Sequence, residues 1–107
     1  MTDPLPAPVA RAIDAVNGGD TDAFLSTFAH DGWIDDNGRR FVGRDRMRAW
    51  SDRELIGANS RFDVTGSEAI DGGVAVDIEV ASDGFNGYSR FAFAVEGETL
   101  RSMTITA

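Results

Sequence analysis

The spacing of apolar residues changes from a helical to a strand period at about Asn59. Before this point apolar side chains recur every three or four residues, as in amphipathic helices, whereas after it they alternate with polar ones. The alternation is longest at Val74, Val76, Ile78 and Val80, which form one continuous apolar face. A helical first half followed by antiparallel strands predicts an α+β fold with helices on one face of a bent sheet.

Three helices are expected in the first half of the chain. The first covers about residues 8–17 and ends at Gly18-Gly19. The second follows a cap at Asp20 or Thr21, and the third extends from about Asp45 to Leu55. Their buried faces are predicted to contain Val9, Ile13 and Val16 in the first, Phe24, Leu25 and Phe28 in the second, and Met47, Trp50 and Glu54 in the third.

A hairpin is expected between the second and third helices, with strands at residues 33–35 and 39–42 joined by Asp36-Asn37-Gly38. His30 and Asp31 are assigned to the turn that precedes it. Four more strands are predicted at about residues 61–65, 74–81, 91–95 and 99–106. Together these segments predict a curved, mostly antiparallel, six-stranded sheet.

Composition limits the classes of function. A chain of 107 residues predicts one domain, covering residues 1–107, with residues 1–7 as a flexible tail. Eighteen acidic residues against ten basic ones give a net charge of −8, which argues against nucleic-acid and membrane partners. With no cysteine and no lysine, disulfides, thiolate chemistry and lysine Schiff bases are excluded. A cytoplasmic location is expected.

Several short motifs resemble the nuclear transport factor 2-like superfamily, with the SnoaL-like and ketosteroid-isomerase-like branches nearest. They are the Gly-Asp at residues 19–20, the Phe-Ala-x-Asp at residues 28–31 and the Gly-Arg-Asp at residues 43–45. The resemblance extends over nearly the whole chain, through RFAFAVEGETLRSMTI near its end. It implies a cone, in which the curved sheet wraps around three helices and a pocket opens at the wide end.

Within this resemblance Asp36 matches the general base of ketosteroid isomerases. A carboxylate among aromatic side chains is poorly solvated, which suits a group that moves a proton between two carbons of an apolar substrate. The oxyanion donors of these isomerases are missing, because their positions fall at Ala12, Phe28, Ser51 and Phe91, or Arg90 in another alignment. The absence of such donors argues against steroid isomerase activity.

The predicted site has two acids and an aromatic wall. Asp36 and Glu54 are the candidate catalytic residues, and the candidate ligand-binding residues are Phe24, Phe28, Trp50, Phe91, Phe93 and Arg53. Two alternatives remain open: Asp36 as a simple turn former, and Glu54 turned outward. One histidine and no cysteine predict no metal site, and no cofactor is expected.

Three functions are compatible with this pattern. The first is a SnoaL-like enzyme acting on a small apolar carbonyl or ring compound, with Asp36 as acid/base and Glu54 or Arg53 assisting. The second is a module that binds a small apolar molecule without turnover, and the third is a dimerising scaffold. A homodimer is expected in any case, through a convex sheet face with small side chains. That face is predicted to contain Ala75, Ala81, Ala92 and Ala94, with Tyr88 and Trp33 as larger contacts.

Overall fold

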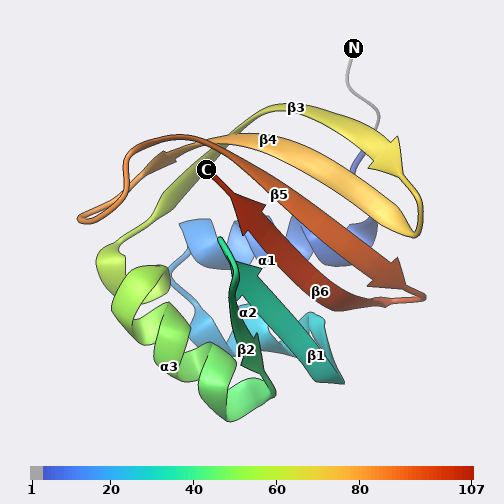
Figure 1. The fold of residues 1–107 in the computed structure, drawn as a ribbon, viewed down its shortest axis with the longest axis horizontal. Helices are drawn as coiled ribbons and strands as arrows, with labels where there is room; N and C mark the ends of the chain where they lie inside the picture. The colour runs from blue at the N-terminus through green and yellow to red at the C-terminus, as the bar shows by residue number, and fades with distance from the viewer. Residues whose placement is uncertain (1–3) are drawn as a thin grey trace.

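The computed structural model describes residues 4–107, in which three α-helices, one short 3-10 helix and six strands are found (Figure 1). In chain order the elements are α1 (Ala7–Asn17), α2 (Thr21–Ser26), β1 (Phe28–Asp36), β2 (Arg39–Val42), α3 (Arg44–Glu54), η1 (Ile56–Ala58), β3 (Arg61–Ile70), β4 (Gly73–Ala81), β5 (Gly87–Glu96) and β6 (Thr99–Thr106).

The six strands form one sheet in the order β2-β1-β6-β5-β4-β3. β1 and β6 run parallel to each other, and every other neighbouring pair is antiparallel. The predicted α+β class, with three helices and a mostly antiparallel six-stranded sheet, is therefore confirmed. The single parallel pair joins the first hairpin to the C-terminal strand, so the end of β1 lies beside the end of β6.

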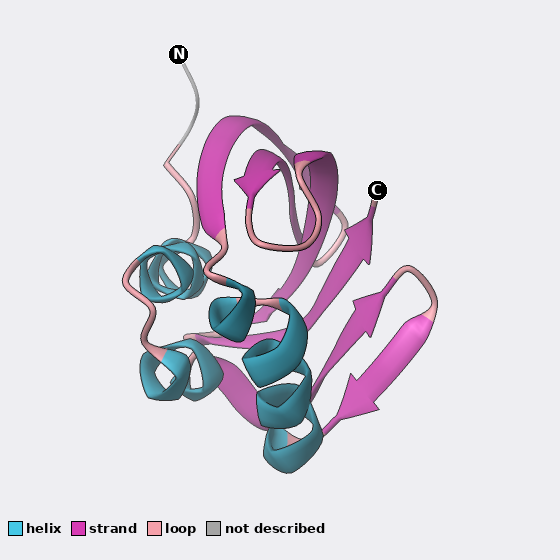
Figure 2. Ribbon diagram, turned by 90° about the vertical axis from the view of Figure 1, so that its left-hand side faces the viewer, coloured by secondary structure: helices cyan, strands magenta, loops and turns pink. Residues whose placement is uncertain are grey.

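The sheet is strongly curved. β3 and β4 arch over α1 in Figure 1, and Figure 2 shows the helices gathered on one side of the sheet. The core lies between the helices and the concave face, where the largest fully buried side chains include Trp50, Phe24, Phe28 and Phe93. Alternation along β4 places Val76 and Ile78 in this core, as the period of 2 predicts.

Local signals set the helix ends. α1 begins at Ala7, with Pro8 in its first turn, and Gly19 leaves the helix with φ +67°, a conformation that glycine adopts without strain. Asp20 caps α2 by accepting a hydrogen bond from the backbone N–H of Ala23 at 3.0 Å. Residues 1–3 of the predicted tail lie outside the described residues, and Leu5 packs against the core.

The first strand differs from its predicted bounds. β1 begins at Phe28, so His30 and Asp31 belong to the strand and not to a turn. α2 ends at Ser26, and Phe28 pairs with Leu100 of β6. Phe28 is still buried, edge-on to Phe24 with ring centroids 5.3 Å apart. A buried aromatic directly after a helix satisfies both periods, and here the pairing with β6 makes it the start of a strand.

The third strand is twice as long as predicted. β3 continues to Ile70, whereas the apolar alternation ends at about residue 65. The register of β3 against β4 shifts between Val64 and Gly66, which indicates a bulge, and the mostly polar residues beyond it pair with the start of β4. β3 is an edge strand, and because residues 63–70 are partly or fully exposed, this part needs no apolar face to pair.

Candidate functional site

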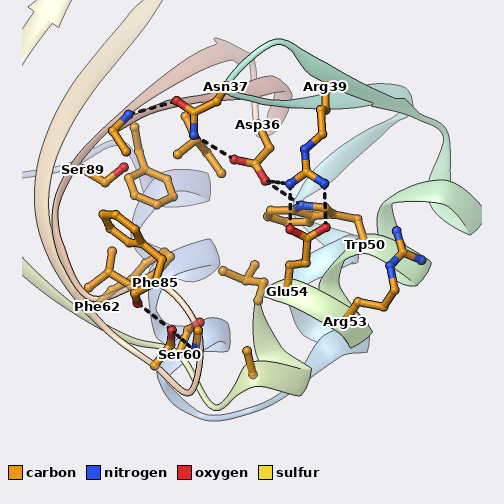
Figure 3. A pocket seen from close by; sticks show the side chains of 18 residues that line it. Asp36, Asn37, Arg39, Trp50, Arg53, Glu54, Ser60, Phe62, Phe85 and Ser89 are labelled. Carbon is orange, nitrogen blue, oxygen red and sulfur yellow. Dashed lines mark hydrogen bonds and ion pairs between the residues drawn. The ribbon is translucent and has the colours of Figure 1, made fainter.

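A cavity of about 330 Å³ lies between the concave face of the sheet, α3 with η1, and the loop after β4 (Figure 3). Its lining has two parts. The apolar part includes Leu55, Phe62, Val80, Phe91 and Ile105, and the polar part includes Asp36, Asn37, Arg39, Arg53 and Glu54. A cavity lined mainly by apolar side chains, with a few polar groups, is the usual form of a small-molecule site.

Asp36 is the central polar residue of the cavity. It is the last residue of β1, and its side chain is 15% exposed. Its Oδ2 accepts hydrogen bonds from Arg39 Nη2 at 2.5 Å and from Trp50 Nε1 at 3.1 Å. Its Oδ1 accepts one long hydrogen bond, at 3.3 Å, from Asn37 Nδ2. One carboxylate oxygen is thus committed to the protein, and the other retains accepting capacity.

The turn after Asp36 is stabilised by its neighbour. The Oδ1 of Asp35 accepts a hydrogen bond from the backbone N–H of Gly38 at 2.8 Å. Asn37 and Gly38 both have positive φ, +50° and +94°, as a tight two-residue hairpin turn requires. Asp35 is therefore the residue whose side chain bonds to the turn backbone. The side chain of Asp36 instead lines the cavity.

Arg39 of β2 joins the two candidate acids. Its Nη2 donates to Asp36 and, at 2.6 Å, to Glu54 Oε1, while its Nη1 donates to Glu54 Oε2 at 3.0 Å. The hydrogen bond from Arg39 lowers the pKa of Glu54, against the smaller, opposite effect of burial. The hydrogen bonds to Glu54 and Asp36 raise the pKa of Arg39 above its usual value. Arg39 therefore forms an ion pair with each of the two carboxylates at the rim (Figure 3).

Trp50 connects the core to the cavity. Its side chain is 2% exposed, so its ring is almost entirely enclosed by protein while its indole N–H donates to Asp36. The periodicity of α3 explains this placement, because Met47 and Trp50 share the buried face of the helix. The aromatic wall opposite is formed by Phe62 and Phe91, with ring centroids 4.8 Å apart.

The structure brings together some of the predicted site residues. Asp36, Trp50, Arg53, Glu54 and Phe91 all line the cavity. Glu54 lies at the rim, where its side chain lines the cavity but is still 35% exposed. It is therefore neither fully buried nor turned away from the cavity.

The other three predicted ligand-binding residues, Phe24, Phe28 and Phe93, are in the buried core and are not among the lining residues. Their inward orientation was predicted correctly from the pattern, but the part of the interior that each occupies depends on the tertiary packing.

Several lining residues were not named from the sequence as site residues. Arg39 lies in the second strand of the predicted hairpin, at residues 39–42. Phe62 was identified only as a strand residue, and Phe85 lies in the loop from Ser82 to Asn86, which reads as a turn. A signal for Phe85 does exist, because a large aromatic side chain in a short Gly-rich loop has no core face to explain it.

The positions that match the isomerase oxyanion donors place no side-chain hydrogen-bond donor in the cavity. Ala12, Phe28 and Phe91 have no side-chain donor. Ser51 is fully buried, and its Oγ has no hydrogen-bond partner in residues 4–107, but it does not line the cavity. Trp50 does line the cavity and has a side-chain donor, but its Nε1 is bonded to Asp36.

Neither a cluster of metal ligands nor a membrane-spanning helix is found in the described part of the chain. No group of three or more His, Cys, Asp or Glu side chains in residues 4–107 is arranged to hold a metal ion. None of the helices found there is long and apolar enough to cross a membrane. His30 is exposed on β1 and does not line the cavity.

Sequence comparisons give no family: no protein-family model matches the chain, and no curated protein is significantly similar to it. Solved structures do match. A protein from Sinorhizobium meliloti, provisionally named a polyketide cyclase, is 24% identical over 95% of each chain, with a TM-score of 0.86.

Two further structures were solved with small molecules. A protein from Catenulispora acidiphila with a ketosteroid isomerase-like fold, in complex with trimethylamine, is 20% identical over 97% of this chain and 87% of its own, with a TM-score of 0.78. The orange carotenoid protein of Anabaena, binding canthaxanthin, is 20% identical over 98% of this chain and 36% of its own, with a TM-score of 0.82. The chain has the fold of the nuclear transport factor 2-like superfamily, as its motifs predict.

Proposed function

We propose that the protein binds a small, uncharged, largely apolar molecule in this cavity, with Asp36 accepting a hydrogen bond from the one polar group of the ligand. The observation that carries the proposal is the state of the Asp36 carboxylate. Its Oδ2 is fixed by Arg39 and Trp50, and its Oδ1 has only one long contact. The side chain is held in place by the protein, so little ordering is needed when a ligand binds.

The charges at the rim favour an uncharged ligand. Arg39 lies between Asp36 and Glu54 and pairs with both, so an ionic ligand that binds to these three groups would have to break an existing ion pair. The apolar lining formed by residues such as Phe62 and Phe91 accommodates the body of the molecule. Structures of the same fold hold trimethylamine and canthaxanthin, which supports a role in binding small molecules.

Binding of 2-naphthol, a neutral two-ring compound with one hydroxyl, tests this proposal by calorimetry. The wild type is expected to bind it saturably. Asp36→Ala should weaken binding about tenfold, because a hydrogen bond to a charged acceptor is lost. Naphthalene has no hydroxyl, so its affinity should change less than twofold.

Asp35→Ala is the matched control, since this neighbouring carboxylate stabilises the turn and is not among the lining residues. It should leave the affinity for 2-naphthol within about twofold of the wild type. The proposal would be wrong if neutral ring compounds of this size showed no saturable binding. It would also be wrong if Asp36→Ala weakened 2-naphthol and naphthalene equally.

The same geometry supports a second candidate, an acid/base enzyme of the SnoaL-like kind. Asp36 Oδ1 has accepting capacity on a carboxylate that lines the cavity, so it can take a proton from a carbon next to a carbonyl group and return it, with Glu54 or Arg53 assisting. Deuterium incorporation into a cyclic ketone in heavy water, abolished by Asp36→Asn, identifies this activity. Binding without exchange identifies a non-catalytic module.

We also propose that two copies of the chain associate through the convex face of the sheet. Tyr88 is 51% exposed there and donates to Asp77, which also pairs with Arg90, while Ala92 and Ala94 are half-buried and Ala81 is exposed. Ala75 is already buried within the monomer and contributes little. Light scattering at micromolar concentration should give twice the chain mass. A Tyr88→Glu variant should be a monomer, because the new charge would be buried between the sheets.

A further inference from the structure

Phe85 differs from every other aromatic residue that lines the cavity. Trp50, Phe62 and Phe91 are 2%, 7% and 3% exposed, so the protein already covers almost all of their surface. Phe85 is 49% exposed, although it also lines the cavity. A ligand therefore has much more apolar surface to cover on Phe85 than on the other three rings. Figure 3 shows Phe85 on the side of the cavity opposite Asp36, Arg39 and Glu54.

The loop that carries Phe85 is organised by its own side chains. Ser82 Oγ donates to the carbonyl of Phe85 at 2.6 Å and accepts from the backbone N–H of Gly84 at 3.0 Å. Asn86 accepts from the backbone N–H of Ser82 at 2.9 Å and donates to its carbonyl at 3.0 Å. These hydrogen bonds join Ser82 to Gly84, Phe85 and Asn86, and so close a compact loop that contains Phe85.

The loop is also attached to the helical side of the cavity. The backbone N–H of Asp83 donates to the carbonyl of Ala58 in η1 at 2.8 Å. Asn59 Nδ2 donates to Asp83 Oδ2 at 2.6 Å. The loop thus bridges the sheet and the end of η1, and its bonded backbone carries a half-exposed aromatic ring. Such preorganisation lowers the ordering cost of binding.

We propose that Phe85 is a specificity-determining residue that clamps the outer part of the ligand and selects fused-ring compounds over single rings. This inference rests on the proposed binding of a neutral apolar molecule in the cavity. A single ring fits against Phe62 and Phe91 and does not reach Phe85. A second ring extends outward to the exposed face of Phe85, with the polar group of the ligand directed to Asp36.

The test compares 2-naphthol with phenol, which differ by one ring. Half of a phenylalanine side chain offers about 100 Å² of apolar surface, and a second ring covers about half of that, so Phe85→Ala should lower the affinity for 2-naphthol about tenfold. The affinity for phenol should fall less than threefold. Since Phe85 is half-exposed, the variant should unfold at the same temperature as the wild type, and Phe85→Leu should recover part of the affinity for 2-naphthol.

Ile70→Ala is the control for a general loss of exposed apolar surface, because Ile70 is 40% exposed and does not line the cavity. It should change neither affinity. Asp83→Ala keeps the Phe85 ring but removes the hydrogen bond between the Asp83 side chain and Asn59. It is expected to lower the affinity for 2-naphthol severalfold, because the loop is less firmly held.

The outcomes separate this inference from the proposed function. Suppose that the wild type binds 2-naphthol, and that Phe85→Ala leaves this affinity unchanged or lowers the affinities for 2-naphthol and phenol equally. The proposed role of Phe85 is then wrong, and the binding function stands. If the wild type binds neither compound saturably, the proposed function fails and the role of Phe85 fails with it.

Discussion

Replacing Trp50 with alanine is expected to lower the free energy of unfolding by about 4 kcal/mol. Trp50 has the largest of the fully buried side chains, and its removal leaves a cavity that the surrounding helices and sheet cannot close. The substitution also removes the indole donor from Asp36 Oδ2. Urea unfolding followed by far-ultraviolet circular dichroism measures the change, since that signal comes mainly from the backbone.

Trp33 provides the matched control. It is only partly buried, on β1, and its ring is covered by the guanidinium of Arg40 at 4.0 Å from the ring centroid. Trp33→Ala should lower the free energy of unfolding by about 1 kcal/mol, because most of the lost contact is with an exposed side chain. A loss for Trp50→Ala no larger than that for Trp33→Ala would contradict the packing described here.

Trp50→Phe separates stability from binding. Phenylalanine retains most of the buried volume but cannot donate to Asp36, so the loss of stability should be smaller than for alanine. The carboxylate loses one of the two groups that hold Oδ2, and Asp36 is then positioned by Arg39 alone. We therefore expect this variant to fold and to bind 2-naphthol more weakly than the wild type.

The sequence predicts most of the fold because the two periods are clear. Val74, Val76, Ile78 and Val80 all lie in the buried face of β4, and Met47 with Trp50 forms the buried face of α3. The errors occur where periodicity carries little information. Phe28 fits both a helix and a strand, and the outer half of β3 is a polar edge whose pairing is set by β4 and not by its own residues.

The candidate site is predicted less completely than the fold. Asp36 is assigned by the family resemblance, and its ion pair with Arg39 is across a turn, so the two residues are local in sequence. Whether an inward aromatic residue lines a cavity or fills the core is decided by residues distant in sequence. Phe91 and Phe93 are neighbours on one face of β5, yet only Phe91 reaches the cavity.

Gly57→Ala is expected to lower the free energy of unfolding by about 3 kcal/mol, for a reason that is entirely steric. A Cβ atom on Gly57 would lie 1.7 Å from the carbonyl oxygen of Asp52, which belongs to the backbone and cannot rotate away. The end of α3 or η1 must therefore move. Because Glu54 and Leu55 lie between these two residues and line the cavity, the affinity for 2-naphthol should fall as well.

Gly84→Ala is the control for this substitution, since the nearest atom to its new Cβ would be Ser82 Oγ at 3.9 Å, an ordinary contact. Its free energy of unfolding should stay within about 0.5 kcal/mol of the wild type. Thermal and urea unfolding of the two variants give the comparison. Equal stabilities would mean that the chain between Asp52 and Gly57 is not as closely packed as the structure shows. If Gly57→Ala lowers both the free energy of unfolding and the affinity for 2-naphthol, the packing of this segment is linked to the shape of the cavity.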